Sequence, residues 1–381
     1  MRFVFVSTMS GYSWGGSEEL WSRAALRLRE ASHKVAASVE FSPQLSTQVT
    51  RLAEGGIRLW VRRTVLPRFP TRVWRRVVSR QPREQEWLRQ QNPDLVIISQ
   101  GANCDGLPWM KLCLKAALRF VAIVQVNAEW WWPTDDSGAE LAEAYRAAQK
   151  VFCICRHNLE LLERQLGKAL PNGVIVWNPY NVSPNQPPAW PKSDIWKLAC
   201  VARLEPAHKG QDLLLSVLAR PQWRNRAMEL NLYGAGPSEH SLRQLVQRLP
   251  LNNAHFRGHI ADVKAIWEHN HILVLPSRLE GIPLSLVEAM FCARPAVVTD
   301  VGGNAELCID GETGFVAAAP AVSLLEQTLE RAWNHRQEWQ RMGTAARTRA
   351  ERLIPNDPIG DFCNEILKCA SPRSHDRQSA R

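Results

Sequence analysis

Short apolar runs rich in β-branched residues recur along the whole chain, and amphipathic stretches of helix length separate them. Strand-like runs that alternate with helical patterns are typical of βαβ units, which build parallel sheets. Each half of the chain holds six such runs, and this predicts an α/β protein of two doubly wound domains in tandem. The runs are residues 2–7, 34–41, 94–99, 120–126, 151–155 and 173–176, followed by 197–202, 229–234, 254–257, 272–275, 296–299 and 314–317.

A proline-rich segment separates the two halves. Residues 182–193 carry four prolines and little periodicity, as expected of a linker. A length of 381 residues also fits two domains. The expected organisation is an N-terminal domain over 1–184, a second domain over 185–355, a final helix over 356–369 and a disordered polar tail over 370–381.

Composition places the chain among folded proteins, because 45% of its residues are hydrophobic and 22% are charged. No apolar run approaches the roughly 18 residues of a membrane-spanning helix. The run at residues 2–7 is typical of a buried strand rather than of a signal peptide. The nine cysteines lack the paired spacing of a zinc site, and we expect reduced, mostly buried thiols in a cytoplasmic protein.

The net charge of +10 is unevenly distributed. Between Arg51 and Gln90, eleven arginines and no lysine stand against three glutamates, a local net charge of +8. Such a segment attracts polyanions or anionic lipid headgroups, and we expect Arg72, Arg75 and Arg76 to contribute to peripheral contact with the inner face of a membrane. The alternative is a solvated, arginine-rich helical face. Nothing resembles a nucleic-acid-binding signature, so no nucleic-acid partner is expected.

The segment with the most specific chemistry follows the run at 272–275 and reads PSRLEGIPLSLVEAM, residues 276–290. Gly281 permits backbone angles that other residues avoid, and Pro283 suits the first turn of a helix. The free amides at a helix start, together with the positive end of the helix dipole, form a site suited to a phosphate.

Two carboxylates of this segment, Glu280 and Glu288, could flank one bound ligand. Glu288 has an alternative, purely structural interpretation, because Ser285 and Glu288 have the spacing of a capping box. Glu280 could equally be a solvated loop carboxylate.

A second cluster reads VARLEPAHKGQD, residues 201–212, and runs from a strand end into a helix. Ligands bind at the carboxyl ends of strands in open α/β sheets, which places Arg203 and Lys209 well for this role. A guanidinium and an ammonium converging there would neutralise a diphosphate, including one that develops charge as a leaving group. Either residue alone would more commonly be a surface charge.

Two glycine-rich turns are less specific. Gly15 and Gly16 join the first strand to the first helix and would let the backbone approach a ligand. The segment from Gly234 to Gly236 begins like a dinucleotide fingerprint, but Glu239 occupies the position of its third glycine, which disfavours a NAD enzyme.

Taken together, these segments resemble the retaining GT-B glycosyltransferases of family 4, the glycosyltransferase group 1 family. The resemblance is best over residues 197–350, and its most specific part is the string from Glu280 to Met290. In the first half it rests on Gly15-Gly16 and on Trp177-Asn178-Pro179. The other marks are Ala202-Arg203-Leu204, Lys209-Gly210, YGAGP at 233–237, RGH at 257–259, VGGNAE at 301–306 and DGETGF at 310–315.

The resemblance implies two Rossmann-like domains facing each other across a cleft, with a nucleotide sugar held mainly by the second. It also implies that the final helix, residues 356–369, crosses back onto the first domain. It assigns the diphosphate to Arg203 and Lys209, the ribose hydroxyls to Glu288 and the transferred sugar to Glu280. The remaining donor-site residues that it implies are Gly15 and Gly16 near the diphosphate, the backbone of Gly281, Ile282, Pro283 and Leu284 near the phosphates, Gly234, and Gly258, His259 and Ile260 near the base.

The sequence departs from the family pattern at two places. Arg203 and Lys209 are six residues apart, one more than the commonest family spacing, so the turn before Lys209 must be longer. The family often offers a histidine after the fourth strand of the first domain, and here the matching position is Asn127. Either Asn127 or Glu129 takes the polar role, or that role is absent. The adjoining Trp130-Trp131-Trp132 could stack on a sugar, and we expect at least two of these rings to pack within the loop.

The function that the resemblance implies is a retaining, hexosyltransferase-like glycosyltransferase in polysaccharide or glycolipid biosynthesis. The acceptor, a glycan, lipid-linked or small-molecule hydroxyl, would attack the face from which the diphosphate leaves, and the diphosphate would help remove its proton. No metal or other cofactor is expected, because Arg203, Lys209 and helix amides would meet the diphosphate charge. The alternatives are a nucleotide-sugar epimerase or hydrolase on the same fold, and a non-catalytic nucleotide-sugar-binding protein.

Overall fold

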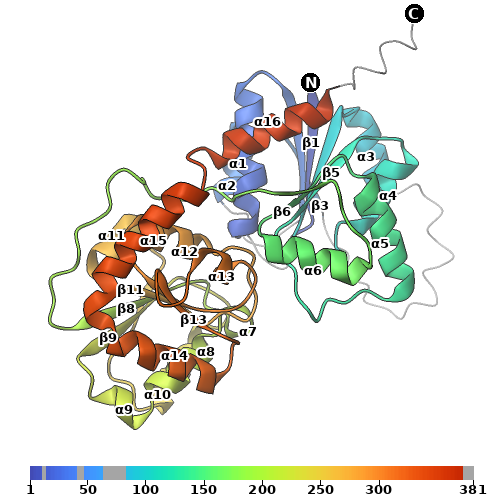
Figure 1. Cartoon of the computed structure of the whole chain (residues 1–381). Helices are drawn as coiled ribbons and strands as arrows, with labels where there is room; N and C mark the ends of the chain where they lie inside the picture. The colour runs from blue at the N-terminus through green and yellow to red at the C-terminus, as the bar shows by residue number, and fades with distance from the viewer. Residues whose placement is uncertain (11–13, 41–46, 63–82, 372–381) are drawn as a thin grey trace, which may run out of the picture. The chain divides into compact units, whose positions relative to one another are not determined.

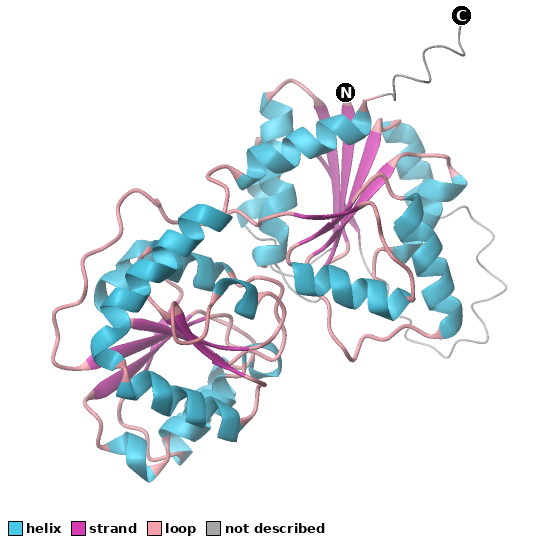
Figure 2. Cartoon of the chain, in the orientation of Figure 1, coloured by secondary structure: helices cyan, strands magenta, loops and turns pink. Residues whose placement is uncertain are grey.

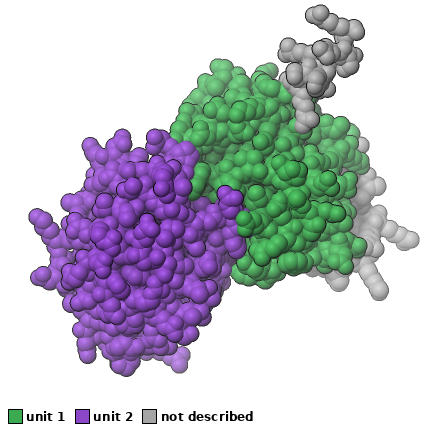
Figure 3. All heavy atoms as spheres, in the orientation of Figure 1, with its two compact units in different colours: residues 1–154, 159–178, 357–381 green, residues 155–158, 179–356 purple. Residues whose placement is uncertain are grey.

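The computed structural model describes residues 1–10, 14–40, 47–62 and 83–371, which form two α/β units (Figure 3). Unit 1 comprises the described residues within 1–154, 159–178 and 357–381, and unit 2 comprises 155–158 and 179–356. In each unit, helices flank a parallel sheet (Figure 2), as the alternating sequence pattern predicts. The expected division at residues 184 and 185 lies close to the observed change of unit at residues 178 and 179.

The sheet of unit 1 has the order β3-β2-β1-β4-β5-β6-β7 (Figure 1). Its central strands are predominantly apolar because helices cover both faces of a parallel sheet. Strand β3 is the one that the hydrophobic pattern did not predict. It lies at the edge of the sheet and reads RLWVR, with an arginine at each end. The strands are β1 (Arg2–Ser7), β2 (Lys34–Glu40), β3 (Arg58–Arg62), β4 (Leu95–Gln100), β5 (Phe120–Val124), β6 (Val151–Cys153) and β7 (Gly173–Ile175).

The helices of unit 1 include the last helix of the chain, α16, which packs against α1. The ring of Phe362 on α16 meets Phe152 of β6 edge-on, with the ring centroids 5.1 Å apart. Arg27 of α1 forms an ion pair of 2.6 Å with Asp357, the residue that caps α16. The helices are α1 (Gly16–Glu30), α2 (Thr47–Glu54), α3 (Arg83–Gln91), α4 (Leu107–Lys115), α5 (Asp135–Ala147), α6 (Arg156–Leu166) and α16 (Pro358–Ala370).

The sheet of unit 2 has the order β10-β9-β8-β11-β12-β13. All six strands were predicted within one or two residues, because their apolar runs are short and sharply bounded. The strands are β8 (Trp196–Val201), β9 (Met228–Tyr233), β10 (Ala254–Gly258), β11 (Ile272–Leu275), β12 (Ala296–Thr299) and β13 (Gly314–Ala317).

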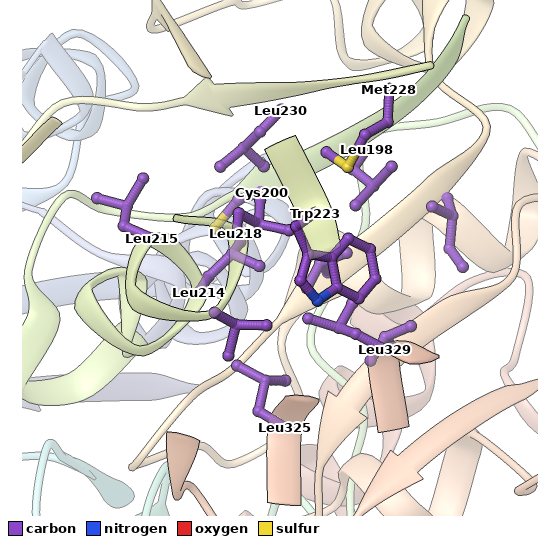
Figure 4. Close-up of a cluster of buried hydrophobic side chains, with 14 of the residues drawn as sticks. Leu198, Cys200, Leu214, Leu215, Leu218, Trp223, Met228, Leu230, Leu325 and Leu329 are labelled. Carbon is purple, nitrogen blue, oxygen red and sulfur yellow. The ribbon is translucent and has the colours of Figure 1, made fainter. Parts of the chain in front are cut away.

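A leucine-rich core fills one side of this second sheet. Figure 4 shows Trp223 among leucines that come from β8, β9, α8 and α14. The helical segments of unit 2 are α7 (Pro206–Lys209), α8 (Gln211–Leu218), α9 (Pro221–Arg224), α10 (Glu239–Arg248), α11 (Val263–His269), α12 (Leu284–Phe291), α13 (Asn304–Leu307), α14 (Val322–Asn334), η2 (Arg336–Glu338) and α15 (Trp339–Leu353).

The cysteines are unbonded, and all but Cys104 are buried, in agreement with the sequence-based expectation. Among the described residues, no helix is both long enough and apolar enough to span a membrane.

Candidate functional site

The carboxyl end of the second sheet brings together the loops that follow β8 and β11. These two strands are neighbours, and the connections that leave them run in opposite directions across the sheet. Open α/β sheets bind ligands at such a switch point. Arg203 and Lys209 follow β8, and Glu280 follows β11. The topology therefore places three of the predicted donor-site residues at one edge of unit 2.

Lys209 and Glu280 are in direct contact there. The Lys209 Nζ atom lies 2.7 Å from Glu280 Oε1, and the Ser277 hydroxyl donates a hydrogen bond of 2.7 Å to the same oxygen. Glu280 is only 6% exposed, so its interpretation as a solvated loop carboxylate is wrong. A buried carboxylate is stable only with such partners.

Arg203 pairs with a different carboxylate. Its Nε atom lies 2.8 Å from Glu205 Oε2, which is also 3.3 Å from His208 Nδ1. The Arg203 side chain is 29% exposed, more than that of Lys209. In this structure the two cations thus have separate anionic partners within the same loop region, and their joint role toward a diphosphate stays a prediction.

Close backbone packing fixes the turn that carries Lys209. Gly210 follows Lys209 with a left-handed φ of 64°, and a Cβ atom at this position would lie 1.9 Å from the Pro276 carbonyl oxygen. Only glycine combines this backbone angle with this approach. The loop after β8 is thereby held against the residue that follows β11.

Arg278 ties the same two loops together. Its guanidinium donates two hydrogen bonds to Asp212, of 2.7 and 2.9 Å, and one of 2.7 Å to the Pro206 carbonyl oxygen. Its backbone amide donates to the His208 carbonyl oxygen at 2.8 Å. Arg278 thus contacts Pro206 at the start of α7 and Asp212 after its end. The sequence analysis assigned no role to Arg278.

Helix α12 begins at Leu284, directly after Pro283, which puts the backbone of Gly281–Leu284 at the helix entrance. Ser285 lies inside the helix and forms no cap, so the capping box with Glu288 is wrong. Instead, Glu288 Oε1 accepts two hydrogen bonds from Asn181, one from the backbone amide at 3.1 Å and one from Nδ2 at 3.2 Å. Glu288 is 4% exposed.

The loops after β9 and β10 continue this edge of the sheet. The Gly234 amide donates to the Gly258 carbonyl oxygen at 2.8 Å, and Gly258 has a left-handed φ of 72°. His259 is exposed and Ile260 is half-buried. Their expected place near a base stays a prediction.

In unit 1, Gly15 precedes the first residue of α1, which is Gly16, and its backbone is extended. Asn127 is buried among amide side chains: its Nδ2 donates to Gln165 Oε1 at 2.8 Å, and Asn103 donates to the same oxygen at 2.8 Å. Glu129 is exposed. The internal hydrogen bonds of Asn127 are typical of a residue that fixes the conformation of a loop. A role of Asn127 or Glu129 near a sugar stays a prediction.

The three neighbouring tryptophans differ in their environment. Trp130 and Trp132 are 61% and 62% exposed, and Trp131 is half-buried. The rings of Trp130 and Trp131 meet edge-on with their centroids 6.3 Å apart, so two of the three rings contact each other within the loop. The exposed tryptophan rings of this loop are available to a ligand.

A buried acid, Glu18, and a half-buried acid, Asp105, lie at the switch point of the first sheet, between β1 and β4. Burial raises the pKa of Glu18 to about 7, and it raises the pKa of Asp105 to about 6. Trp21 Nε1 donates to Glu18 at 2.7 Å, and the Thr8 hydroxyl donates to Asp105 at 2.6 Å. Sequence analysis did not single out Glu18 or Asp105, because no local sequence pattern predicts that a carboxylate is removed from solvent.

Glu18 should make stability depend on pH. Its pKa rises from an ordinary value of 4.5 to about 7 on folding, so its contribution to stability is complete below pH 4.5 and is lost as the pH rises through 7. Glu18→Gln keeps an oxygen for Trp21 but does not titrate. We expect this variant to gain unfolding temperature relative to the parent as the pH rises through this range. A difference that is constant with pH would contradict the prediction.

The arginine-rich segment is described only in part. Residues 63–82, with Arg72, Arg75 and Arg76, lie outside the described residues. Arg62 belongs to β3, where its guanidinium donates to Ser38 at 2.9 Å and to the Ser7 carbonyl oxygen, while Arg58 lies exposed on the same strand. The alternative of a solvated, arginine-rich helical face is therefore wrong for residues 58–62, which form a strand.

Solved structures with the same architecture define the fold. The crystal structure of Anabaena Alr3699/HepE in complex with UDP covers 97% of this chain and all of its own, with a TM-score of 0.74 at 18% identity. Sucrose-phosphate synthase from Thermosynechococcus elongatus covers 97% of this chain and 98% of its own, with a TM-score of 0.72 at 16% identity. The chain has the GT-B fold.

The family match lies in unit 2. Residues 196–335 match the family described as Glycosyl transferases group 1. The D-rhamnosyltransferase WbpZ of Pseudomonas aeruginosa is 29% identical over 152 residues, 39% of each chain. The lipopolysaccharide core biosynthesis mannosyltransferase LpcC of Rhizobium leguminosarum is 42% identical over 64 residues, 17% of this chain and 18% of its own. The chain thus spans less than half the length of these relatives, and the matches support a glycosyltransferase.

Proposed function

We propose that this protein is a retaining, hexosyltransferase-like glycosyltransferase of family 4. It moves a sugar from a nucleotide-diphosphate sugar to a hydroxyl of a glycan, lipid-linked or small-molecule acceptor. The observation that carries the proposal is the buried Lys209–Glu280 contact at the switch point of the unit that matches the family. UDP-glucose bound to Anabaena Alr3699/HepE, a protein of the same fold, supports a nucleotide sugar as donor.

Each residue of the site has a distinct part in this reaction. Lys209 and Arg203 neutralise the diphosphate, whose charge grows as it leaves, and the amides at the start of α12 add to this stabilisation. Glu280 contacts the transferred sugar, and Glu288 accepts hydrogen bonds from the ribose hydroxyls. The acceptor attacks the face from which the diphosphate departs, and the diphosphate helps to take its proton.

A panel of nucleotide sugars tests the proposal on the purified full chain. Slow hydrolysis of one donor without acceptor, and transfer when an acceptor extract is added, supports a transferase. NMR of the anomeric proton in the product then reports retention or inversion. Interconversion of sugars would favour an epimerase, donor hydrolysis that no acceptor diverts would favour a hydrolase, and binding without turnover would favour a non-catalytic protein.

Donor hydrolysis should survive removal of metal ions, because protein cations meet the diphosphate charge in this proposal. We expect equal rates in EDTA and in excess Mg²⁺ after dialysis against chelator. A rate that vanishes in EDTA and returns with Mg²⁺ would assign part of the charge neutralisation to a metal ion.

Glu288→Gln should raise the KM for the donor by about 10- to 100-fold, the scale of a hydrogen bond to a charged group. The variant keeps an acceptor oxygen for Asn181, so its unfolding temperature should change little. Asn181→Ala is the matched control, since it removes the side-chain hydrogen bond to Glu288 and keeps both the backbone hydrogen bond and the carboxylate. If the two variants lose stability equally and leave KM unchanged, Glu288 only anchors the segment around Asn181.

For the acceptor side, we propose peripheral contact with an anionic membrane through the segment from Arg51 to Gln90. Among its described arginines, Arg51, Arg58, Arg83 and Arg89 are exposed, which supports this contact. Binding to anionic vesicles should weaken with salt, because exposed charges are screened within about 8–10 Å near physiological ionic strength. Equal binding to neutral and anionic vesicles would contradict it.

A further inference from the structure

A groove on unit 1 is lined by residues other than those of the predicted donor site. It is open to solvent, encloses about 880 Å³, and runs between α5, the end of α6 and the loop before α5. The side chains that give it chemical character are Trp132, Asp135, Glu143, Arg146, Arg164 and Lys168.

Three exposed cations line this groove. Arg146 lies on α5, Arg164 lies on α6, and Lys168 follows α6. Within the part of the chain that the structure describes, no ion pair is formed by any of the three. Nearby, Lys111 of α4 is satisfied by Glu140 of α5 at 2.7 Å. Unlike that surface pair, the three cations of the groove are available to an anionic ligand.

The other side chains of the groove suit a saccharide. Trp132 is 62% exposed, and an exposed aromatic ring can pack against the apolar face of a sugar. Asp135 and Glu143 are exposed carboxylates that can accept hydrogen bonds from hydroxyl groups. A lipid headgroup layer cannot enter a concave groove as a single saccharide chain can.

We propose that this groove binds an anionic glycan, a saccharide chain with acidic groups that pair with Arg146, Arg164 and Lys168 while one sugar packs on Trp132. Guanidinium groups match acidic oxygens with two parallel hydrogen bonds, which favours carboxylate or phosphate substituents on the glycan. The proposal concerns binding and does not depend on sugar transfer.

Calorimetric titration of the full chain with oligogalacturonate, and with maltooligosaccharides of the same length as neutral controls, tests this inference. We expect binding of oligogalacturonate alone, with an affinity that falls as salt is added. The triple variant Arg146→Ser, Arg164→Ser, Lys168→Ser should bind about tenfold more weakly, since exposed ion pairs contribute little each but act together. Trp132→Ala should also weaken binding while preserving its salt dependence.

The matched control removes the same charge elsewhere on unit 1. Arg29, Lys34 and Lys115 are exposed there, and replacing all three by serine should leave the affinity unchanged. Donor hydrolysis should be normal in both triple variants, which separates this test from that of the proposed function. The proposal would be overturned if oligogalacturonate did not bind, or if both glycans bound equally. It would also be overturned if the two triple variants had equal effects, or if anionic vesicles displaced oligogalacturonate from Arg146, Arg164 and Lys168.

Discussion

Lys209→Ala should lower turnover of the donor by about 10²–10³-fold, the scale seen when a group that stabilises developing charge is removed. The same change leaves the buried Glu280 carboxylate without its cation and with Ser277 as a remaining partner. Breaking a buried pair in this way costs roughly 3–5 kcal/mol, and we expect the lower end of that range because Ser277 remains. Steady-state kinetics and chemical denaturation measure the two effects separately.

Arg203→Ala provides the comparison, since Arg203 is more exposed and pairs with Glu205 rather than with Glu280. The Arg203→Ala variant should turn over the donor about 10²–10³-fold more slowly, like Lys209→Ala, but it should lose less stability than Lys209→Ala. Arg248→Ala is the control, because Arg248 is an exposed cation at the end of α10 in the same unit, and both quantities should stay at the parent values. Near-normal turnover in the Lys209 and Arg203 variants alike would remove the donor-site assignment.

The sequence predicts most strands of both sheets because a strand buried on both faces must be apolar along its length. The string ILVL of β11 is such a case, and it is buried at every position. Strand β3 escapes the same reasoning because it lies at a sheet edge, where Arg58 and Arg62 are tolerated. Long-range hydrogen bonding to a neighbour, and not local pattern, makes it a strand.

The candidate site could be predicted only as far as residue type and strand order reveal it. The carboxyl ends of β8 and β11 could be expected to hold Lys209 and Glu280, since both follow apolar runs. The contact of Asn181 with Glu288 joins residues 107 positions apart, and that of Arg278 with Asp212 joins residues 66 positions apart. No local pattern encodes either pairing, because each depends on how the loops pack after the sheet has formed.

The turn at Gly210 should be the most sensitive backbone position of the site. Gly210→Ala places a methyl group 1.9 Å from the Pro276 carbonyl oxygen, so the loop after β8 must move away from the loop after β11. A left-handed φ costs an alanine about 1–2 kcal/mol, and overpacking adds roughly 1–3 kcal/mol. Because Lys209 precedes this glycine, we expect the displaced loop to weaken the Lys209–Glu280 contact and to lower turnover together with the unfolding temperature.

Gly311→Ala separates backbone strain from the clash. Gly311 has a similar φ of 76°, but a Cβ atom there would meet no atom within 4 Å. This variant should lose only the roughly 1–2 kcal/mol of a left-handed alanine, and it should keep most of its turnover. If Gly210→Ala unfolds at the same temperature as Gly311→Ala and turns over the donor at the same rate, the close approach of the two loops does not position Lys209. A larger loss in both quantities for Gly210→Ala would show that the packing of Gly210 against Pro276 sets the geometry of the cation.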